Sequence, residues 1–289
     1  MHFANTLHAA VDDKQSVLCL GLDPHWDRIP EFLKADCEPA EAILKFLVPI
    51  IDACEPHIVA VKPQIAFFEV FGSAGFAAFE KICMYAKAKG LIVIVDAKRG
   101  DIGSTAEAYA ESYLGKNRPY DALTVNPYMG EDTLIPFVEK AKENEKGIFV
   151  LVKTSNLGSG DFQDQPVGEE LLHEVVARTV SRVGTLDMTS ENYSSVGAVV
   201  GATYPDELSL LRSDMPAQIF LIPGYGAQGG KAEDLKPAFY SNGHGAIVNS
   251  SRGILFAFEG KTEPENFAEE AGKAAKFAKD DLARVVFSD

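Results

Sequence analysis

The chain alternates between short apolar runs and longer amphipathic stretches. Each apolar run ends at a polar or turn residue, as Leu91–Val95 ends at Asp96. Short runs without polar alternation are typical of parallel strands that are buried on both faces. The pattern predicts eight strands, at Val17–Leu22, Ile58–Val61, Leu91–Val95, Ala122–Val125, Gly147–Val152, Val196–Val200, Gln218–Ile222 and Ala246–Val248.

The stretches between these runs have helical periodicity. After Glu265, for example, apolar residues recur at steps of three and four, which predicts one helical face. The predicted helices include Ala40–Ala53, Gly75–Lys89, Glu131–Asn144, Glu169–Val183, Pro205–Leu211 and a last one containing Phe267 and Val285. Eight alternating strand–helix units without a composition break predict an α/β fold, a TIM (β/α)8 barrel, in a single domain over residues 1–289. A six-stranded doubly wound sheet is the alternative.

Four charged residues follow the third strand within six positions: Asp96, Lys98, Arg99 and Asp101. If the strand continues, Asp96 and Lys98 point to the same side, because strand side chains alternate. A solvated loop with an ion pair is the simpler interpretation. Charges at the carboxyl end of a buried strand nevertheless favour an active site. A lysine between two carboxylates keeps its proton, so Lys98 suits proton donation better than nucleophilic attack.

The strand gives way to a helix soon after these charges. Gly100 and Gly103 break the extended run. Ser104 and Glu107 have capping-box spacing, which predicts a helix that begins there and ends at Gly115.

Other predicted strands also end in polar residues. Asp23, Lys62 and Ser155 follow the first, second and fifth strands. Together with Asp96 and Lys98 they converge at one barrel mouth, where buried charges require mutual pairing. Lys62 has two possible roles: it forms a Schiff base, as lysines do in barrel aldolases, or it is a charged member of an ion-pair network. Nearby carboxylates favour the network.

A glycine-rich segment follows the seventh predicted strand, at residues 223–230. It satisfies the dinucleotide-binding pattern G-x-G-x-x-G, but Pro237 leaves no room for a long helix, and no acidic residue stands about twenty positions on. After strand seven of a barrel, such a loop presents backbone N–H groups to a phosphate. Arg252, just after the eighth strand, adds a charged phosphate contact.

Residues 157–167 form the longest polar, turn-rich connection, after the fifth strand. They are either a surface loop or a lid over bound substrate.

Composition limits the remaining possibilities. A formal net charge of −15 argues against a nucleic-acid surface and an anionic membrane. The N-terminal residues lack the pattern of a signal peptide, and no apolar run is long enough for a transmembrane span. The four cysteines and six histidines lack metal-site spacing, so we expect no metal and reduced thiols in a cytoplasmic protein.

The third-strand motif carries a family resemblance. Asp96-x-Lys98-x-x-Asp101-Ile102-x-x-Thr105 resembles the signature of orotidine 5′-phosphate decarboxylases, and the run from Asp96 to Thr105 resembles their longer bacterial branch. The order of Asp23, Lys62 and the glycine-rich loop also resembles that family. The Asp-x-Lys-x-x-Asp core alone is shared with sugar-phosphate decarboxylases and aldolases.

The resemblance implies decarboxylation of orotidine 5′-phosphate to UMP, the last step of de novo UMP synthesis, without metal or cofactor. It implies that Lys98 protonates C6 of the pyrimidine while Asp96 lies against the substrate carboxylate. It implies ribose and network contacts for Asp23 and Lys62, and a pyrimidine contact for Ser155. Gln228 would bridge the ring and the phosphate, Gly229 would bind substrate as part of the phosphate loop, and Arg252 would bind the phosphate. It further implies a homodimer in which Asp101 and Thr105 reach the neighbouring subunit's site.

Two other functions remain open from the sequence. One is a metal-dependent sugar-phosphate decarboxylase or aldolase of the same superfamily. The other is a catalytically silent nucleotide-phosphate binding protein, although such a protein would not require two carboxylates beside the substrate's own.

Overall fold

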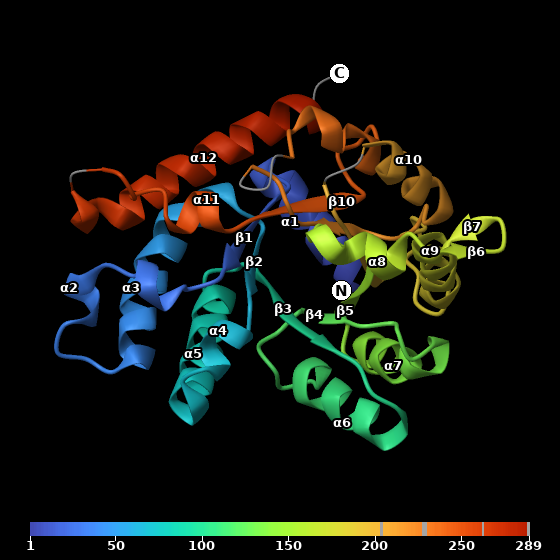
Figure 1. Cartoon of the computed structure of the whole chain (residues 1–289), viewed down its shortest axis with the longest axis horizontal. Helices are drawn as coiled ribbons and strands as arrows, with labels where there is room; N and C mark the ends of the chain where they lie inside the picture. Colours follow the sequence, from blue (N-terminus) through green and yellow to red (C-terminus); the bar gives the residue numbers. More distant parts are fainter. Residues whose placement is uncertain (203–204, 227–229, 262, 288–289) are drawn as a thin grey trace.

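Parallel strands at the centre of the molecule form the scaffold for the site (Figure 1). The structure is a computed structural model, and it describes residues 1–202, 205–226, 230–261 and 263–287. Within these residues eight strands close into a barrel, in the order β1, β10, β9, β8, β5, β4, β3, β2. Their bounds are β1 (Leu18–Leu22), β2 (Ala60–Pro63), β3 (Ile92–Arg99), β4 (Ala122–Val125), β5 (Gly147–Lys153), β8 (Val196–Val200), β9 (Phe220–Ile222) and β10 (Ala246–Ser250).

The parallel pairing of β1 with β10 closes the barrel. The predicted TIM barrel is therefore confirmed, and the open six-stranded sheet is wrong. Most strands begin and end near the expected residues, because uninterrupted apolar runs define their buried cores. The third strand is the main difference, since β3 continues through the charged residues to Arg99.

Longer helices surround the strands (Figure 1). They are α3 (Pro39–Cys54), α5 (Gly72–Ala88), α6 (Gly103–Leu114), α7 (Ile135–Glu143), α9 (Leu172–Gly184), α10 (Pro205–Asp214) and α12 (Phe267–Val286). Shorter helical segments lie in the connections: α2 (Glu31–Lys34), α4 (Ala66–Glu69), α8 (Gly160–Gln163), α11 (Arg252–Leu255), and the 3-10 turns at Trp26–Arg28, Glu55–His57, Glu131–Thr133, Leu157–Ser159, Glu233–Ala238 and Pro264–Asn266.

A helix that precedes the barrel, α1 (Phe3–Lys14), packs against the start of β5. The Phe3 ring meets Phe149 edge to face, with centroids 6.0 Å apart. A side chain at Gly147 would approach the Phe3 ring to 2.3 Å, so only glycine permits this packing. The helix therefore lies at the amino ends of the strands, and the carboxyl ends are left for the site.

Several helix starts differ from the sequence prediction. For example, α7 begins at Ile135 instead of Glu131, because a 3-10 turn occupies Glu131–Thr133. Two other differences have a clear local cause. The helix α6 begins at Gly103, with Ile102 as its N-cap, and Ser104 makes no capping bond. Gly103 has φ 50°, and this left-handed turn starts the helix one residue early, which places Ser104 inside the first turn. The predicted Ser104 capping box is thus wrong. The expected helix from Glu169 begins at Leu172 instead, because preceding residues form a small hairpin of β6 (Pro166–Val167) and β7 (Glu170–Leu171).

Candidate active site

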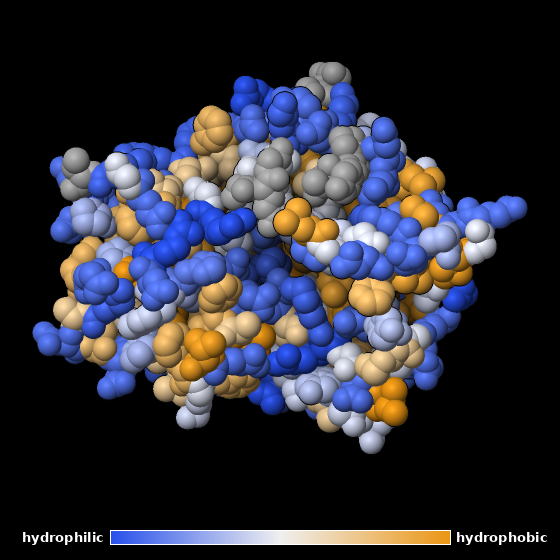
Figure 2. All heavy atoms as spheres, viewed as in Figure 1, coloured by the Kyte–Doolittle hydropathy of each residue, from blue (hydrophilic) through white to orange (hydrophobic). Residues whose placement is uncertain are grey.

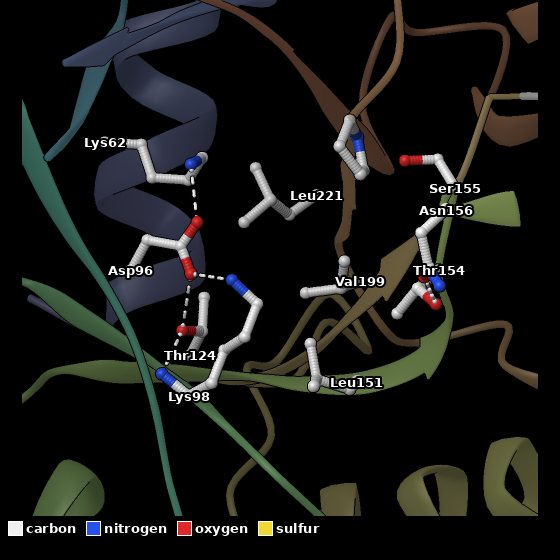
Figure 3. A pocket seen from close by; sticks show the side chains of 11 residues that line it. Lys62, Asp96, Lys98, Thr124, Leu151, Thr154, Ser155, Asn156, Val199 and Leu221 are labelled. Atoms are coloured by element: carbon white, nitrogen blue, oxygen red, sulfur yellow. Dashed lines mark hydrogen bonds and ion pairs between the residues drawn. The ribbon is translucent and has the colours of Figure 1, made fainter. Parts of the chain in front are cut away.

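A charged network lies at the carboxyl ends of β2 and β3. The Lys62 ammonium donates to Asp96 Oδ2 at 2.7 Å, and the Lys98 ammonium donates to Asp96 Oδ1 at 2.5 Å (Figure 3). Lys62 and Asp96 are buried, whereas the Lys98 side chain is 45% exposed at the mouth. One carboxylate thus holds two ammonium groups, and one of them remains accessible to a ligand. The expectation that Asp96 and Lys98 share a side is confirmed.

The network fixes the charge state of its buried members. Burial opposes ionisation of Asp96, but attraction and hydrogen bonds from Lys62 and Lys98 outweigh burial and hold its carboxyl pKa well below the usual range. Burial likewise opposes the charge on Lys62, yet Asp96 and Asp23 raise its pKa above the ordinary value. Lys62 is therefore a charged lysine, and the alternative of a neutral Schiff-base nucleophile is not supported.

These charges line a cavity of about 230 Å³ at the barrel mouth. Lys62, Asp96, Lys98 and Thr124 lie on one side, and Thr154, Ser155 and Asn156 lie opposite, with Leu151, Val199 and Leu221 between them (Figure 3). Figure 2 shows a central hollow from this side, with largely hydrophilic walls. The cavity thus places charge on one wall, hydrogen-bonding groups on the other and apolar side chains between, which suits a flat polar ring with a charged substituent.

A second cavity adjoins the first, because Lys62 lines both. It is formed by Asp23, Lys62, Pro223, Gly224, Tyr225, Asn249, Ser251 and Arg252. Asp23 Oδ1 and Asn249 Oδ1 are buried there without a hydrogen-bond partner among the described residues. Buried acceptors are usually paired, so this pair indicates a place for hydroxyl donors of a ligand. Arg252 is exposed at the start of α11 and supplies positive charge.

The segment after β5 folds back toward the end of its own strand. Thr154 and Gln163 exchange two hydrogen bonds, from Thr154 N at 2.9 Å and from Gln163 Nε2 at 2.8 Å. The buried Lys153 pairs with Asp164, and this bond holds the Asp164 pKa below its ordinary value. The connection at residues 157–167 is thus a folded element attached beside Ser155, rather than an unanchored loop.

The structure brings most of the predicted site residues together. Lys62, Asp96, Lys98 and Ser155 line the first cavity, and Asp23 and Arg252 line the second. Asp101 and Thr105 line neither: Asp101 accepts the backbone N–H of Ile102 at 2.8 Å, and Thr105 is exposed on α6. Gln228 and Gly229 lie outside the described residues.

Arg99, the third of the four charged residues at this strand end, points away from the site. Arg99 donates to Glu69 and to the Tyr113 hydroxyl, both at 3.0 Å, on the helix side of the barrel. Its position after Lys98 on a strand predicts this opposite orientation.

Sequence reasoning did not single out several polar residues that line the site, among them Thr124 and Asn249. Each is a polar residue near the carboxyl end of a strand, in β4 and β10 respectively. Thr124 lies inside the predicted run Ala122–Val125, and Asn249 directly follows the run Ala246–Val248. A search for polar side chains at the end of each run and just after it would have found both.

Across the described residues, no three His, Cys, Asp or Glu side chains are grouped so as to hold a metal ion. No helix in the described part of the chain is both long and apolar enough to cross a bilayer.

Residues 16–267 match the orotidine 5′-phosphate decarboxylase / HUMPS family. This chain belongs to that family. Curated relatives named orotidine 5′-phosphate decarboxylase include one from Rhodopirellula baltica, 47% identical over 89% of this chain and 89% of the relative. Another, from Deinococcus radiodurans, is 44% identical over 88% of this chain and 89% of the relative.

Solved structures of the decarboxylase family superpose on the whole barrel. The Leishmania donovani OMP decarboxylase has a TM-score of 0.80 at 34% identity and covers 100% of both chains. A putative orotidine 5′-phosphate decarboxylase from Streptomyces avermitilis has a TM-score of 0.82 at 35% identity and covers 99% of this chain and 96% of that structure.

Proposed function

We propose that this protein decarboxylates orotidine 5′-phosphate to UMP and CO₂, as the relatives' name implies. The observation that carries the proposal is the array of Lys62, Asp96 and Lys98 at the barrel mouth of a chain from this family. In this array the Asp96 carboxylate lies where it would repel the substrate carboxylate, and the accessible Lys98 ammonium can stabilise the negative charge that develops on C6.

In the proposed reaction, the bond between C6 and the substrate carboxyl group breaks, and CO₂ leaves. The electron pair stays on C6, in the ring plane, where no π-system delocalises it. The Lys98 ammonium stabilises this carbanion and then donates its proton to C6. Because Lys98 is partly exposed, it regains a proton from solvent.

Asp96 has two tasks in this proposal. It lies against the substrate carboxylate, and it holds Lys98 in place through their 2.5 Å hydrogen bond. Lys62 keeps Asp96 ionised from the opposite side, as the lowered Asp96 pKa indicates. The charges are arranged before substrate arrives, so little reorganisation is needed in the transition state.

The rest of the substrate extends toward the second cavity. We assign the pyrimidine to Ser155 and the ribose hydroxyls to Asp23 and Lys62, supported by the unpaired Asp23 Oδ1. Arg252, with Gln228 and Gly229 outside the described residues, would hold the phosphate. Binding energy from the phosphate then helps to order the reacting ring.

The proposal includes a homodimer, with Asp101 and Thr105 serving the partner's site. Exposed apolar side chains support such an interface: Ile102 is 62%, Tyr128 83% and Met129 45% exposed. Their loops adjoin, because a Cβ added at Gly100 would lie 3.6 Å from Met129 Cε. Exposed apolar groups beside a charged mouth are typical of a protein–protein contact.

We also propose a single domain over residues 1–289 and a cytoplasmic location. The four free cysteines support a reducing compartment.

A direct assay tests the function. Purified protein is mixed with orotidine 5′-phosphate, with and without EDTA, and loss of the substrate's ultraviolet absorbance is followed together with UMP formation. Metal-independent conversion supports the proposal. Turnover of a sugar phosphate that EDTA abolishes would instead favour the aldolase-like alternative. Tight UMP binding without any turnover would favour a silent binding protein.

A further inference from the structure

The pairing of β3 with β4 is irregular beside the charged network. Val95 pairs with Leu123, and the next pair joins Arg99 to Val125. Three residues of β3 (Asp96, Ala97 and Lys98) therefore stand opposite one residue of β4, Thr124. The backbone N–H groups of the two extra residues cannot both pair with main-chain acceptors on β4, so this bulge needs another hydrogen-bond acceptor.

The Thr124 hydroxyl supplies that acceptor. Its Oγ1 accepts the backbone N–H of Ala97 at 3.1 Å and that of Lys98 at 2.9 Å, and donates to Asp96 Oδ1 at 3.1 Å. Thr124 is only 1% exposed. A hydroxyl has one proton to donate and two lone pairs, so these three bonds use its whole capacity.

The bulge also imposes an unusual backbone conformation on Lys98. Its φ is 48°, in the left-handed region that residues other than glycine rarely adopt. Such a conformation persists only where surrounding contacts enforce it. The bond from Lys98 N to Thr124 is one such contact, and Figure 3 shows the lysine passing Thr124 on its way to Asp96.

We propose that Thr124 is a positioning residue for the reaction. Its hydroxyl holds the β3 bulge that aims Lys98 into the cavity and orients the Asp96 oxygen that Lys98 shares. Thr124 acts through these two residues. This inference rests on the proposed decarboxylation, in which Lys98 is the proton donor.

Loss of the hydroxyl has a defined consequence. Without it, the backbone N–H groups of Ala97 and Lys98 lose their acceptor and Asp96 Oδ1 loses a donor. The Lys98 backbone then relaxes from its strained conformation. The ammonium is then displaced from C6, and a displacement of about 1 Å lowers kcat by roughly 100-fold. Contacts to ribose and phosphate lie in the second cavity, so binding of UMP should change little.

The test compares Thr124→Val, which keeps the side-chain shape without a hydroxyl, with Thr124→Ser, which keeps the hydroxyl. Thr189→Val is the matched control: Thr189 is also buried, and its Oγ1 accepts the Tyr193 N–H at 3.0 Å. Each protein is assayed for kcat, KM, UMP affinity and melting temperature. Thr124→Ala replaces Thr124→Val if the valine variant does not fold.

We expect Thr124→Val to lose roughly 100-fold in kcat with UMP affinity within about threefold of wild type, while Thr124→Ser stays within about threefold of wild-type kcat. Thr189→Val should lose stability but keep its kcat. The inference is overturned if Thr124→Val keeps a near-normal kcat, or if Thr124→Ser loses as much kcat as Thr124→Val. It is also overturned if Thr189→Val, at a similar loss of stability, loses as much kcat as Thr124→Val. Absence of turnover in the wild type would contradict the proposed function itself.

Discussion

Replacement of Asp96 by asparagine tests whether mutual pairing holds the buried charges in the folded protein. Lys62 is 6% exposed, and its ammonium lies 2.7 Å from Asp96 Oδ2. Asp96→Asn keeps the size of the side chain but removes the charge that Lys62 needs. Breaking a buried ion pair from one side typically costs about 3–5 kcal/mol. Since Asp23 also stabilises the Lys62 charge, we expect the lower end, a loss of about 3 kcal/mol in unfolding free energy.

A double variant isolates the interaction energy between Lys62 and Asp96. Lys62→Met/Asp96→Asn removes both buried charges, and replacing a buried pair by uncharged side chains is often close to neutral. We therefore expect the double variant to be more stable than Asp96→Asn alone, with a coupling energy of about 2 kcal/mol in the cycle completed by Lys62→Met.

Urea unfolding at pH 7.5 measures each free energy, with the single tryptophan, Trp26, as fluorescent probe. Asp13→Asn, at an exposed position, is the control and should change stability by less than about 0.5 kcal/mol. A loss below about 1 kcal/mol in Asp96→Asn, or no coupling with Lys62→Met, would refute the view that the pair stabilises the fold.

Three further outcomes follow from the structure. Arg252→Ala and removal of the substrate phosphate should each lower kcat/KM strongly, and their effects should not add when they are combined. If Arg252→Ala had a much lower kcat/KM than wild type on the phosphate-free substrate, Arg252 would serve another group. Lys98→Ala and Asp101→Asn chains should each be inactive alone and should recover roughly a quarter of wild-type activity when they are mixed and exchange subunits. About half of the dimers then contain one chain of each kind and have one functional site. If mass spectrometry confirms exchange but activity does not recover, Asp101 acts in the site of its own chain. Burial, aided by the nearby His244, lowers the His8 pKa to about 4, so the folded protein disfavours the proton that the unfolded chain accepts near pH 6.5. From pH 7.5 to pH 5, the unfolding free energy of wild type should therefore fall by about 2 kcal/mol more than that of His8→Phe. Urea unfolding at the two pH values measures both. Equal decreases in the two proteins would contradict the lowered His8 pKa.

The sequence predicts the barrel well because its determinants are local. Each apolar run such as Leu91–Val95 is long enough to define a buried strand, and the polar residue after it marks the carboxyl end. Closure of the barrel brings those ends together, so Lys62, Asp96 and Lys98 meet as expected from their strand assignments.

The details that the sequence did not predict depend on contacts between strands. The bulge opposite Thr124 arises from the register of β3 against β4, which no local pattern encodes. The early start of α6 depends on the left-handed turn at Gly103, which overrides the cap pattern at Ser104. Asp101 illustrates a third limit, because its expected role requires a second chain.

The central claim is that Lys98 acts on charge that appears only in the transition state. Lys98→Ala is compared with wild type for turnover of orotidine 5′-phosphate and for affinity for UMP, with Lys45→Ala, an exposed lysine on α3 paired with Glu41, as control. We predict that kcat falls by at least about 1,000-fold in Lys98→Ala while UMP affinity changes by less than about tenfold, and that Lys45→Ala matches wild type. Near-normal turnover in Lys98→Ala, or a loss of UMP affinity as large as the loss of kcat, would contradict the account.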